Sequence, residues 1–219
     1  MPKVEFLPAI ITYMSSIITF LKSIKQRLPW LWNVVEFING VLIRLFYGRS
    51  IVVAVSKSLN NNESPYLYRK LTAKDASLLV DFISHQPSGF DKFFKPHDFD
   101  LKTFKRVLKS GTYILIGAFD GDILVGYCFI RFFINKSAFR GKIVDKEYQG
   151  RGIAKQMGLI MSTVASNAGF RVYATISKDN VASLKSAKYG STIEIIKELP
   201  DNYLYVEIKE NKSLVSNII

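Results

Sequence analysis

The feature that most constrains this chain is a glycine-rich turn inside the segment from Val144 to Ala154, which reads VDKEYQGRGIA. An apolar, strand-like run ends at Val144 and an amphipathic helical pattern begins after Gly152, so the glycines join a strand to a helix. Glycine lets backbone N–H groups approach an anion without a Cβ in the way, and a helix start adds unpaired N–H donors. Arg151 and Lys155 add positive charge. The segment therefore suits a pyrophosphate, although the same residues also suit a plain helix cap with surface charge.

Two other phosphate-binding loops do not fit this segment. It lacks the Gly-Lys-Ser/Thr ending of a Walker loop. It also lacks the Gly-x-Gly-x-x-Gly spacing of a Rossmann loop, and no acidic residue follows about 20 positions later at the end of a second strand. These two nucleotide-binding classes are therefore excluded.

From Tyr66 onward, strand-like apolar runs alternate with amphipathic helical patterns. Asp120-Gly121 supplies the positive φ that a tight hairpin requires. Thr72 begins one helix, and Gly169 ends the helix that follows the glycine-rich turn. The pattern predicts an α/β domain with strands near 66–71, 113–119, 123–133, 138–144, 171–176, 192–197 and 203–209, and with helices near 72–85, 101–109, 153–168 and 181–188.

The glycine-rich segment resembles the acyl-coenzyme A (acyl-CoA) loop of the GNAT superfamily of N-acetyltransferases. That loop has Gln or Arg, two residues, Gly, one residue, and then Gly or Ala, and Gln149, Gly152 and Ala154 match it. The family usually has Val-x-Pro before the loop, whereas Lys146 replaces the proline here. This departure is mild.

A second motif supports the resemblance. The family often has Asn, then Ser or Ala three residues later, then a helix that ends near Gly; Asn180, Ser183 and Gly190 match this spacing. The order of the elements also agrees. The resemblance covers about two-thirds of the chain.

The resemblance implies a mixed, mostly antiparallel sheet flanked by helices, here with an N-terminal helical extension. The fourth and fifth strands would splay, and acetyl-CoA would enter the gap as the acyl donor. The backbone near Val144 would bind the thioester carbonyl and stabilise the developing oxyanion, while Asn180 and Ser183 would contact the pantetheine arm. The pyrophosphate would be held by the backbone N–H groups of Gln149, Gly150, Arg151, Gly152, Ile153 and Ala154.

A primary amine would attack the thioester directly, so a base must take its proton and an acid must protonate the leaving thiolate. Many family members place a tyrosine seven residues after the Asn, where this chain has Ala187, so Tyr189 is the candidate acid. His97 is the candidate base or acceptor-site ligand, because histidine titrates near neutral pH. The alternatives are structural: Tyr189 packs at a helix end, and His97 orients a turn.

The acceptor pocket is expected near Phe93–Phe99, where aromatic and basic side chains suit a sugar ring and a diphosphate. The Phe-x-Pro-His stretch there is similar to GNAT proteins of bacterial surface-polysaccharide synthesis, which implies an amino sugar on a nucleotide or lipid carrier. A protein N-terminus, a lysine or a small polyamine also remains open. A catalytically inactive acyl-CoA-binding scaffold or a membrane-surface interaction protein is the alternative function.

The first fifty residues differ from the rest, because Phe6–Phe20 and Trp30–Tyr47 are apolar runs with helical spacing. Neither run is a comfortable membrane span or a signal peptide. Six basic and two acidic residues give the segment a charge of +4. It suits a helical hairpin that covers the main domain or pairs with another subunit, and it also suits an amphipathic pair on an acidic membrane face.

The chain therefore divides into four predicted parts. Residues 1–50 are an amphipathic helical extension, residues 51–65 a short strand and a linker, residues 66–210 the GNAT-like domain, and residues 211–219 a tail. The linker is placed at 60–65 because it has no large apolar residue and ends in a proline.

Thirty Lys and Arg against eighteen Asp and Glu give a formal charge of +12, which favours an anionic partner. No nucleic-acid recognition motif accompanies this charge, so we expect no nucleic acid. The single cysteine, Cys128, forms no intramolecular disulfide, and with His85 and His97 it supplies too few ligands for a zinc site. We expect a cytoplasmic protein without metal, peripheral on the inner membrane face.

Overall fold

The computed structural model describes residues 29–60, 64–189 and 191–210. The chain divides into two compact units, Met1–Val41 and Leu42–Ile219. Helix α2 (Pro29–Asn60) begins in the first unit and ends in the second. The sheet and the later helices belong to the second unit.

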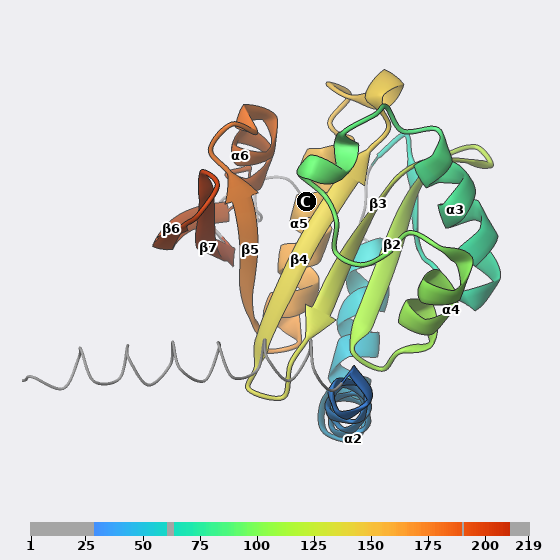
Figure 1. The fold of residues 1–219 in the computed structure, drawn as a ribbon, viewed down its shortest axis with the longest axis vertical. Helices are drawn as coiled ribbons and strands as arrows, with labels where there is room; N and C mark the ends of the chain where they lie inside the picture. The colour runs from blue at the N-terminus through green and yellow to red at the C-terminus, as the bar shows by residue number, and fades with distance from the viewer. Residues whose placement is uncertain (1–28, 61–63, 190, 211–219) are drawn as a thin grey trace, which may run out of the picture. The chain divides into compact units, whose positions relative to one another are not determined.

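The second unit contains a seven-stranded sheet with the strand order β1-β2-β3-β4-β5-β7-β6 (Figure 1). Neighbouring strands are antiparallel, except that β4 and β5 run parallel. The strands are β1 (Leu67–Lys70), β2 (Tyr113–Asp120), β3 (Ile123–Phe132), β4 (Ser137–Val144), β5 (Arg171–Ser177), β6 (Ser191–Leu199) and β7 (Tyr203–Glu210). The predicted mixed, mostly antiparallel sheet is therefore confirmed.

Helices cover both faces of this sheet, as Figure 1 shows. Helix α5 (Ile153–Asn167) and the second half of α2 share one core, in which Ile43 and Val55 of α2 and Met157 of α5 are buried. The other face carries α3 (Ala76–Ser84) and α4 (Leu101–Lys109), which pack against a second core that includes Tyr127 and Phe129. The shorter helices are η1 (Ala73–Asp75), η2 (Phe90–Lys92), η3 (Lys146–Tyr148) and α6 (Val181–Ala187).

Strands β4 and β5 pair over only three residues each, 137–139 with 171–173. Beyond that point β4 stays paired with β3 as far as Val144, and β5 stays paired with β7 as far as Ser177. The two strands diverge in Figure 1, with α5 behind them. The predicted splay between the fourth and fifth strands is confirmed, and it opens toward the carboxyl end of both.

The helix boundaries follow local chemistry. The backbone N–H of Thr72 donates to Asp75 Oδ2 at 2.7 Å, and the Thr72 hydroxyl donates to the same oxygen at 3.0 Å, before η1 and α3. Gly121 has φ +57° in the turn between β2 and β3, and Gly169 has φ +80° after α5. Glycine adopts these conformations without steric cost, so the predicted turn and helix end are confirmed.

The short strand predicted over 51–55 is wrong, because these residues lie inside α2. Ile51, Ala54, Val55 and Ser58 are buried at three- and four-residue spacing, which places them on one helix face. Their contact with the core outweighs the strand preference of β-branched side chains. The unit boundary after Val41 also lies earlier than the linker predicted at 60–65.

Three further predictions fall partly or wholly outside the described residues: the apolar run 6–20, the middle of the linker at 61–63, and the tail 211–219. The predicted helix over 30–47 is confirmed as part of α2. Within the described residues, Val34–Asn60 is long and apolar enough to cross a membrane by length and composition, with a hydropathy of 1.5. A core helix or a signal sequence passes the same criterion.

Candidate active site

The glycine-rich turn connects β4 to α5 through η3. Gly150 has φ +80° and Gly152 has φ +84°, and Gly152 is the residue before the first turn of α5. A Cβ built on either glycine would meet no atom within 4 Å. The glycines are therefore required for their backbone conformation, and the space above them is open.

This turn presents a row of unused backbone donors. In the part of the chain that the structure describes, no acceptor contacts the N–H groups of Gly150, Arg151, Gly152, Ile153 and Ala154. The N–H of Gln149 donates to the Lys146 carbonyl at 3.4 Å, so it is partly used. Five consecutive donors without an acceptor at the start of a fifteen-residue helix suit an anionic ligand.

Neighbouring hydrogen bonds hold the turn in place. The backbone N–H of Asp145 donates to the Val125 carbonyl at 2.9 Å, and Asp145 Oδ1 accepts from the N–H of Glu147 at 2.9 Å. Gln86, at the end of α3, donates to Asp145 Oδ2 at 3.1 Å. The turn is thus fixed to β3 and to α3, rather than only to its own helix.

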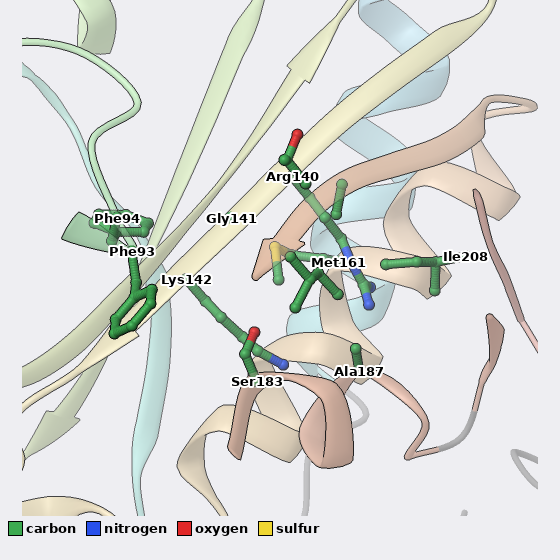
Figure 2. Close-up of a pocket in the computed structure, with 12 residues that line it drawn as sticks. Phe93, Phe94, Arg140, Gly141, Lys142, Met161, Ser183, Ala187 and Ile208 are labelled. Carbon is green, nitrogen blue, oxygen red and sulfur yellow. The ribbon is translucent and has the colours of Figure 1, made fainter. Parts of the chain in front are cut away.

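The splay between β4 and β5 contains a small pocket of about 60 Å³. Figure 2 shows side chains from β4 reaching into it toward α5 and α6. It is lined by Phe93, Phe94, Arg140, Gly141, Lys142, Met161, Ala174, Thr175, Ile176, Ser183, Ala187 and Ile208. The pocket and the glycine-rich turn flank the same end of β4.

Two cations of β4 occupy the α5 side of this pocket. Arg140 is 5 % exposed and donates to the Gly158 carbonyl at 2.8 Å and to Ser162 Oγ at 2.6 Å. Lys142 Nζ donates to the Ala154 carbonyl at 2.7 Å. Burial lowers the pKa of Lys142 to about 7, with Arg140 adding repulsion, and burial lowers the pKa of Arg140 to about 10.

Aromatic side chains form the opposite wall. Phe94 lies edge-on to Tyr127, with ring centroids 5.5 Å apart, and a Cβ on Gly141 would come within 2.6 Å of Phe129. Glycine in the middle of β4 therefore lets this wall approach the strand. The Tyr203 hydroxyl of β7 donates to the Lys92 carbonyl of η2 at 2.6 Å, which ties the aromatic segment to the far side of the splay.

A larger hollow of about 320 Å³ lies where β4 and β5 still pair. Tyr173 and Tyr205 stack in it with ring centroids 5.5 Å apart and planes 6° from parallel. The lining residues are Phe133, Asn135, Ser137, Ala138, Phe139, Tyr173 and Tyr205. Phe139 is two residues from Gly141 on β4, so the hollow begins about 7 Å along the strand from the pocket.

The second predicted motif lies at the start of α6. Asn180 Oδ1 accepts from the N–H of Ser183 at 2.9 Å, so the Asn side chain caps the helix. Ser183 and Ala187 line the pocket, and Ala187 occupies the position where a tyrosine acid was sought. Tyr189 does not line it; the Lys155 ammonium lies 5.0 Å from the Tyr189 ring centroid, beside the first turn of α5.

His97 is placed away from the pocket. Its Nδ1 donates to the Asp98 carbonyl at 2.7 Å, and its ring packs edge-on against Phe104 with centroids 5.1 Å apart. Its Nε2 is buried without a hydrogen-bond partner in the described structure. Burial lowers the pKa of His97, so the ring is neutral at neutral pH.

The structure thus gathers the cofactor-binding residues predicted from sequence, from Val144 through Ala154 and at Ser183, around one end of the splay. Sequence reasoning missed Arg140 and Lys142. They lie on the same face of β4 as buried Ala138 and Val144, and two cations at alternate positions between apolar residues of a strand are a detectable signal. Cys128, expected in the core, is fully buried opposite Lys142.

No cluster of three or more His, Cys, Asp or Glu able to hold a metal ion occurs within residues 29–60, 64–189 and 191–210. The described residues suit an anionic ligand.

The comparisons with known proteins agree with this geometry. Residues 80–185 match the family model described as "Acetyltransferase (GNAT) domain". The search of curated proteins found no match.

Solved structures share the fold. The GNAT domain of S. lividans PAT has a TM-score of 0.56 and 20 % identity, covering 65 % of this chain and 89 % of that one. The ribosomal-protein-S5-alanine acetyltransferase from Vibrio fischeri has a TM-score of 0.55 and 16 % identity, covering 70 % and 97 %. The aminoglycoside acetyltransferase AAC(6′)-Ib, solved with coenzyme A and kanamycin, has a TM-score of 0.54 and 11 % identity, covering 70 % and 99 %.

Proposed function

We propose that this chain, whose residues 80–185 match a GNAT acetyltransferase domain, transfers an acetyl group from acetyl-CoA to a primary amine. The observation that carries the proposal is the row of five free N–H groups at Gly150–Ala154, next to the splay between β4 and β5. Donors in this arrangement bind a pyrophosphate without needing a metal ion. Structural neighbours include acetyltransferases solved with coenzyme A, which supports the same donor here.

Each part of the site then has a role. The N–H groups of Gly150–Ala154 bind the donor's pyrophosphate, and the splay with Ser183 accepts its pantetheine arm. The β4 backbone near Val144 stabilises negative charge on the thioester oxygen. The amine nitrogen forms the new bond to the acetyl carbon, the carbon–sulfur bond breaks, and the amine proton passes to a base or a water chain.

This proposal does not assign the general base or the general acid to a residue. His97 packs against Phe104, and Tyr189 lies beside Lys155, so neither lines the pocket. Tyr189 remains the candidate acid because its contact with Lys155 places it at the first turn of α5, next to the donor-binding turn. His97 remains a candidate only if its ring leaves the aromatic cluster.

We further propose an amino sugar as the acceptor. Phe93 and Phe94 line the pocket in the splay together with Lys142, and Phe93 is 42 % exposed, so a ligand can reach its ring. Aromatic faces stack on the apolar face of a sugar ring. One structural neighbour, AAC(6′)-Ib, is an aminoglycoside acetyltransferase, and an aminoglycoside is an amine-bearing sugar.

The first experiment is thermal unfolding with acetyl-CoA. Ligand at ~100 times its dissociation constant stabilises by about 2.7 kcal/mol, which for a chain of this size raises the melting temperature by roughly 5–10 °C. No shift at millimolar acetyl-CoA would contradict donor binding.

Release of free thiol with a panel of amines then tests the reaction. Glucosamine-type sugars, a polyamine and a peptide N-terminus separate the acceptor classes. Phe93→Ala should raise KM for an amino sugar and leave the KM for acetyl-CoA unchanged. A thermal shift without thiol release from any amine would identify the chain as an acyl-CoA-binding scaffold.

A second proposed function is peripheral contact with an acidic membrane face through α2. Leu45 and Phe46 are each about 70 % exposed on this helix and Val52 and Val53 about 60 %, and their spacing places all four on one face. Residues 42–60 carry Arg44, Arg49 and Lys57 but no acidic residue. Exposed apolar side chains beside basic ones suit the headgroup region of anionic lipid.

Liposome flotation tests this contact. We expect the full chain to float with vesicles that contain anionic lipid, and Phe46→Ser/Val53→Ser, which changes two exposed side chains on one face of α2, to reduce the floated fraction. Leu67→Ser, which removes an exposed apolar side chain from β1, is the matched control. Failure of the unaltered chain to float would contradict membrane contact.

A further inference from the structure

Arg140 and Lys142 are two cations without a carboxylate partner inside the splay. They alternate along β4 on the face that packs against α5, between buried Ala138 and buried Val144. Among the described residues, they donate only to the carbonyls of α5 and to Ser162 Oγ. Figure 2 shows both side chains extending from β4 into the pocket.

The helix is adapted to these cations. A Cβ on Gly158 would lie 3.0 Å from Lys142 Nζ, so glycine in the middle of α5 leaves room for the ammonium group. Glycine inside a helix is unfavourable by about 0.5–1 kcal/mol relative to alanine. The Gly158 carbonyl also accepts from Arg140. Both observations indicate that α5 accommodates the pair rather than excluding it.

Burying two like charges without a counter-charge is unfavourable, because each loses water and they repel one another. The ionisable groups that influence Lys142 are Arg140 on its own strand and Cys128 on β3. The α5, α6, β5 and β7 residues that line the pocket carry no ionisable side chain. An anion that enters the pocket would therefore relieve the repulsion directly.

We propose that Arg140 and Lys142 bind the carboxylate of a transferase ligand inside the splay. A pocket of about 60 Å³ has room for a carboxylate, since ~10–15 Å³ of such cavity volume already accepts one water. Ser183, which also lines the pocket, adds a hydroxyl donor.

This inference rests on the proposed acyl transfer, in which either the acyl-CoA donor or the amine acceptor carries the carboxylate. Lys142 and Arg140 lie two and four residues before Val144, about 7 and 13 Å along the strand. An acyl chain that ends in a carboxylate would reach them from a thioester near Val144. An acceptor beside Phe93 would reach the same cations from the opposite wall of the pocket. The shared chemistry is a carboxylate, and the two sources need separate tests.

The donor arm compares acetyl-CoA with succinyl-CoA by calorimetry at pH 6.5. If the donor carries the carboxylate, succinyl-CoA binds about tenfold or more tightly than acetyl-CoA, as expected for a charge-assisted pair of hydrogen bonds. Arg140→Met and Lys142→Met should abolish the difference. Lys102→Met, which removes an exposed lysine from α4, should keep it.

The acceptor arm compares each amine with the same amine bearing a carboxylate, using acetyl-CoA as donor. If the acceptor carries the carboxylate, the acidic amine has a kcat/KM about tenfold or more higher. The advantage should disappear in Arg140→Met. Equal values in both arms would overturn the proposal even if acetyl-CoA turns over normally.

Free succinate, titrated against the full chain, separates this inference from the proposed function. Binding of succinate to the wild type that is lost in Arg140→Met supports the carboxylate site even if acetyl-CoA does not bind. Succinate that does not bind, together with equal affinities for both thioesters, overturns it. If Arg140→Met does not fold, Lys142→Met gives the same comparison, and succinate binding that persists in a folded variant of either residue overturns the site.

A pH series gives an independent readout. With a pKa of about 7 in the free protein, Lys142 must take up a proton when a carboxylate binds above pH 7, so the affinity for succinate should fall as pH rises from 7 to 9. Lys142→Arg keeps its charge and should retain its affinity at pH 9. An affinity that does not change with pH in the wild type would contradict the role of Lys142.

Discussion

The glycine-rich turn and the cation pair of β4 are two anion-binding regions built in different ways. The turn uses backbone N–H groups at Gly150–Ala154, which carry partial charge, and its residues Gly150–Gly152 are exposed. The pair uses the full charges of Arg140 and Lys142, which are largely buried. The first keeps its charge at every pH, whereas the second can lose a proton near neutral pH.

Because the two regions are built differently, different changes should damage ligand binding at each. The turn depends on backbone conformation, so a substitution that strains φ should damage it. The pair depends on desolvated charge, so a change of pH or an uncharged side chain should damage it. The variants below separate the two, from the largest expected effect to the smallest.

Gly152→Val should weaken ligand binding at the turn and leave the cation pair unaffected. Valine at φ +84° is strained by about 1–2 kcal/mol and moves the N–H groups that follow it. Loss of charge-assisted bonds worth about 1.5–3 kcal/mol should weaken acetyl-CoA binding by ~10–100-fold in calorimetry. Succinate binding at Arg140 and Lys142 should be unaffected.

The matched control is Gly169→Val, at φ +80° beyond the other end of α5. Like Gly152, Gly169 has no atom within 4 Å of a new Cβ. Both variants should therefore lose similar stability, but only Gly152→Val should lose affinity for acetyl-CoA. Equal affinities in the two variants would remove the donor-binding assignment of the turn.

Lys142→Met should change the pH dependence of stability. The folded pKa of about 7 lies below the unfolded value, so the unfolded chain binds more protons between the two and stability rises with pH in that window. Below pH 7 both states are protonated and this gain is absent. Relative to Lys142→Met, the wild type should gain about 2–3 kcal/mol of unfolding free energy from pH 6 to pH 9.

Urea unfolding at both pH values measures this difference. Lys102→Met serves as the control because Lys102 is exposed on α4. A wild type and a Lys142→Met variant with parallel pH profiles would show that Lys142 keeps an ordinary pKa. The buried-charge description of the pair would then be wrong.

Tyr203→Phe should destabilise the aromatic wall of the pocket that holds Arg140 and Lys142, and it should leave the glycine-rich turn unchanged. It removes the 2.6 Å hydrogen bond to the Lys92 carbonyl, for an expected loss of about 0.5–1.5 kcal/mol. The KM for the acceptor should rise more than the affinity for acetyl-CoA falls. Tyr205→Phe, on the same strand, is the control, and an equal effect of both variants would deny Tyr203 this role.

His97→Phe should have the smallest effect, because His97 lies outside both regions and packs against Phe104. The ring packing is kept while the titrating group is removed. We expect the pH–rate profile to keep its shape. A fall in turnover of ~10²-fold or more would instead identify His97 as the general base, as the sequence first indicated.

Much of the fold was predictable because its signals are local. The turn between β2 and β3, the capped start of α3 and the end of α5 each depend on one or two residues, such as Gly121, Thr72 and Gly169. The strand predicted at 51–55 failed for the opposite reason. Its β-branched residues favour a strand locally, but burial of Ile51 and Val55 on one helix face decides the structure.

The candidate site divides in the same way. The glycines before an amphipathic helix predicted a helix start that suits either an anion or a plain cap, because the required φ values and free N–H groups are properties of the local backbone. Only the tertiary structure placed Arg140 and Lys142 inside the splay and moved His97 into an aromatic cluster. Burial and charge pairing depend on neighbours far away in the chain, and local spacing carries no information about which side of β4 meets α5.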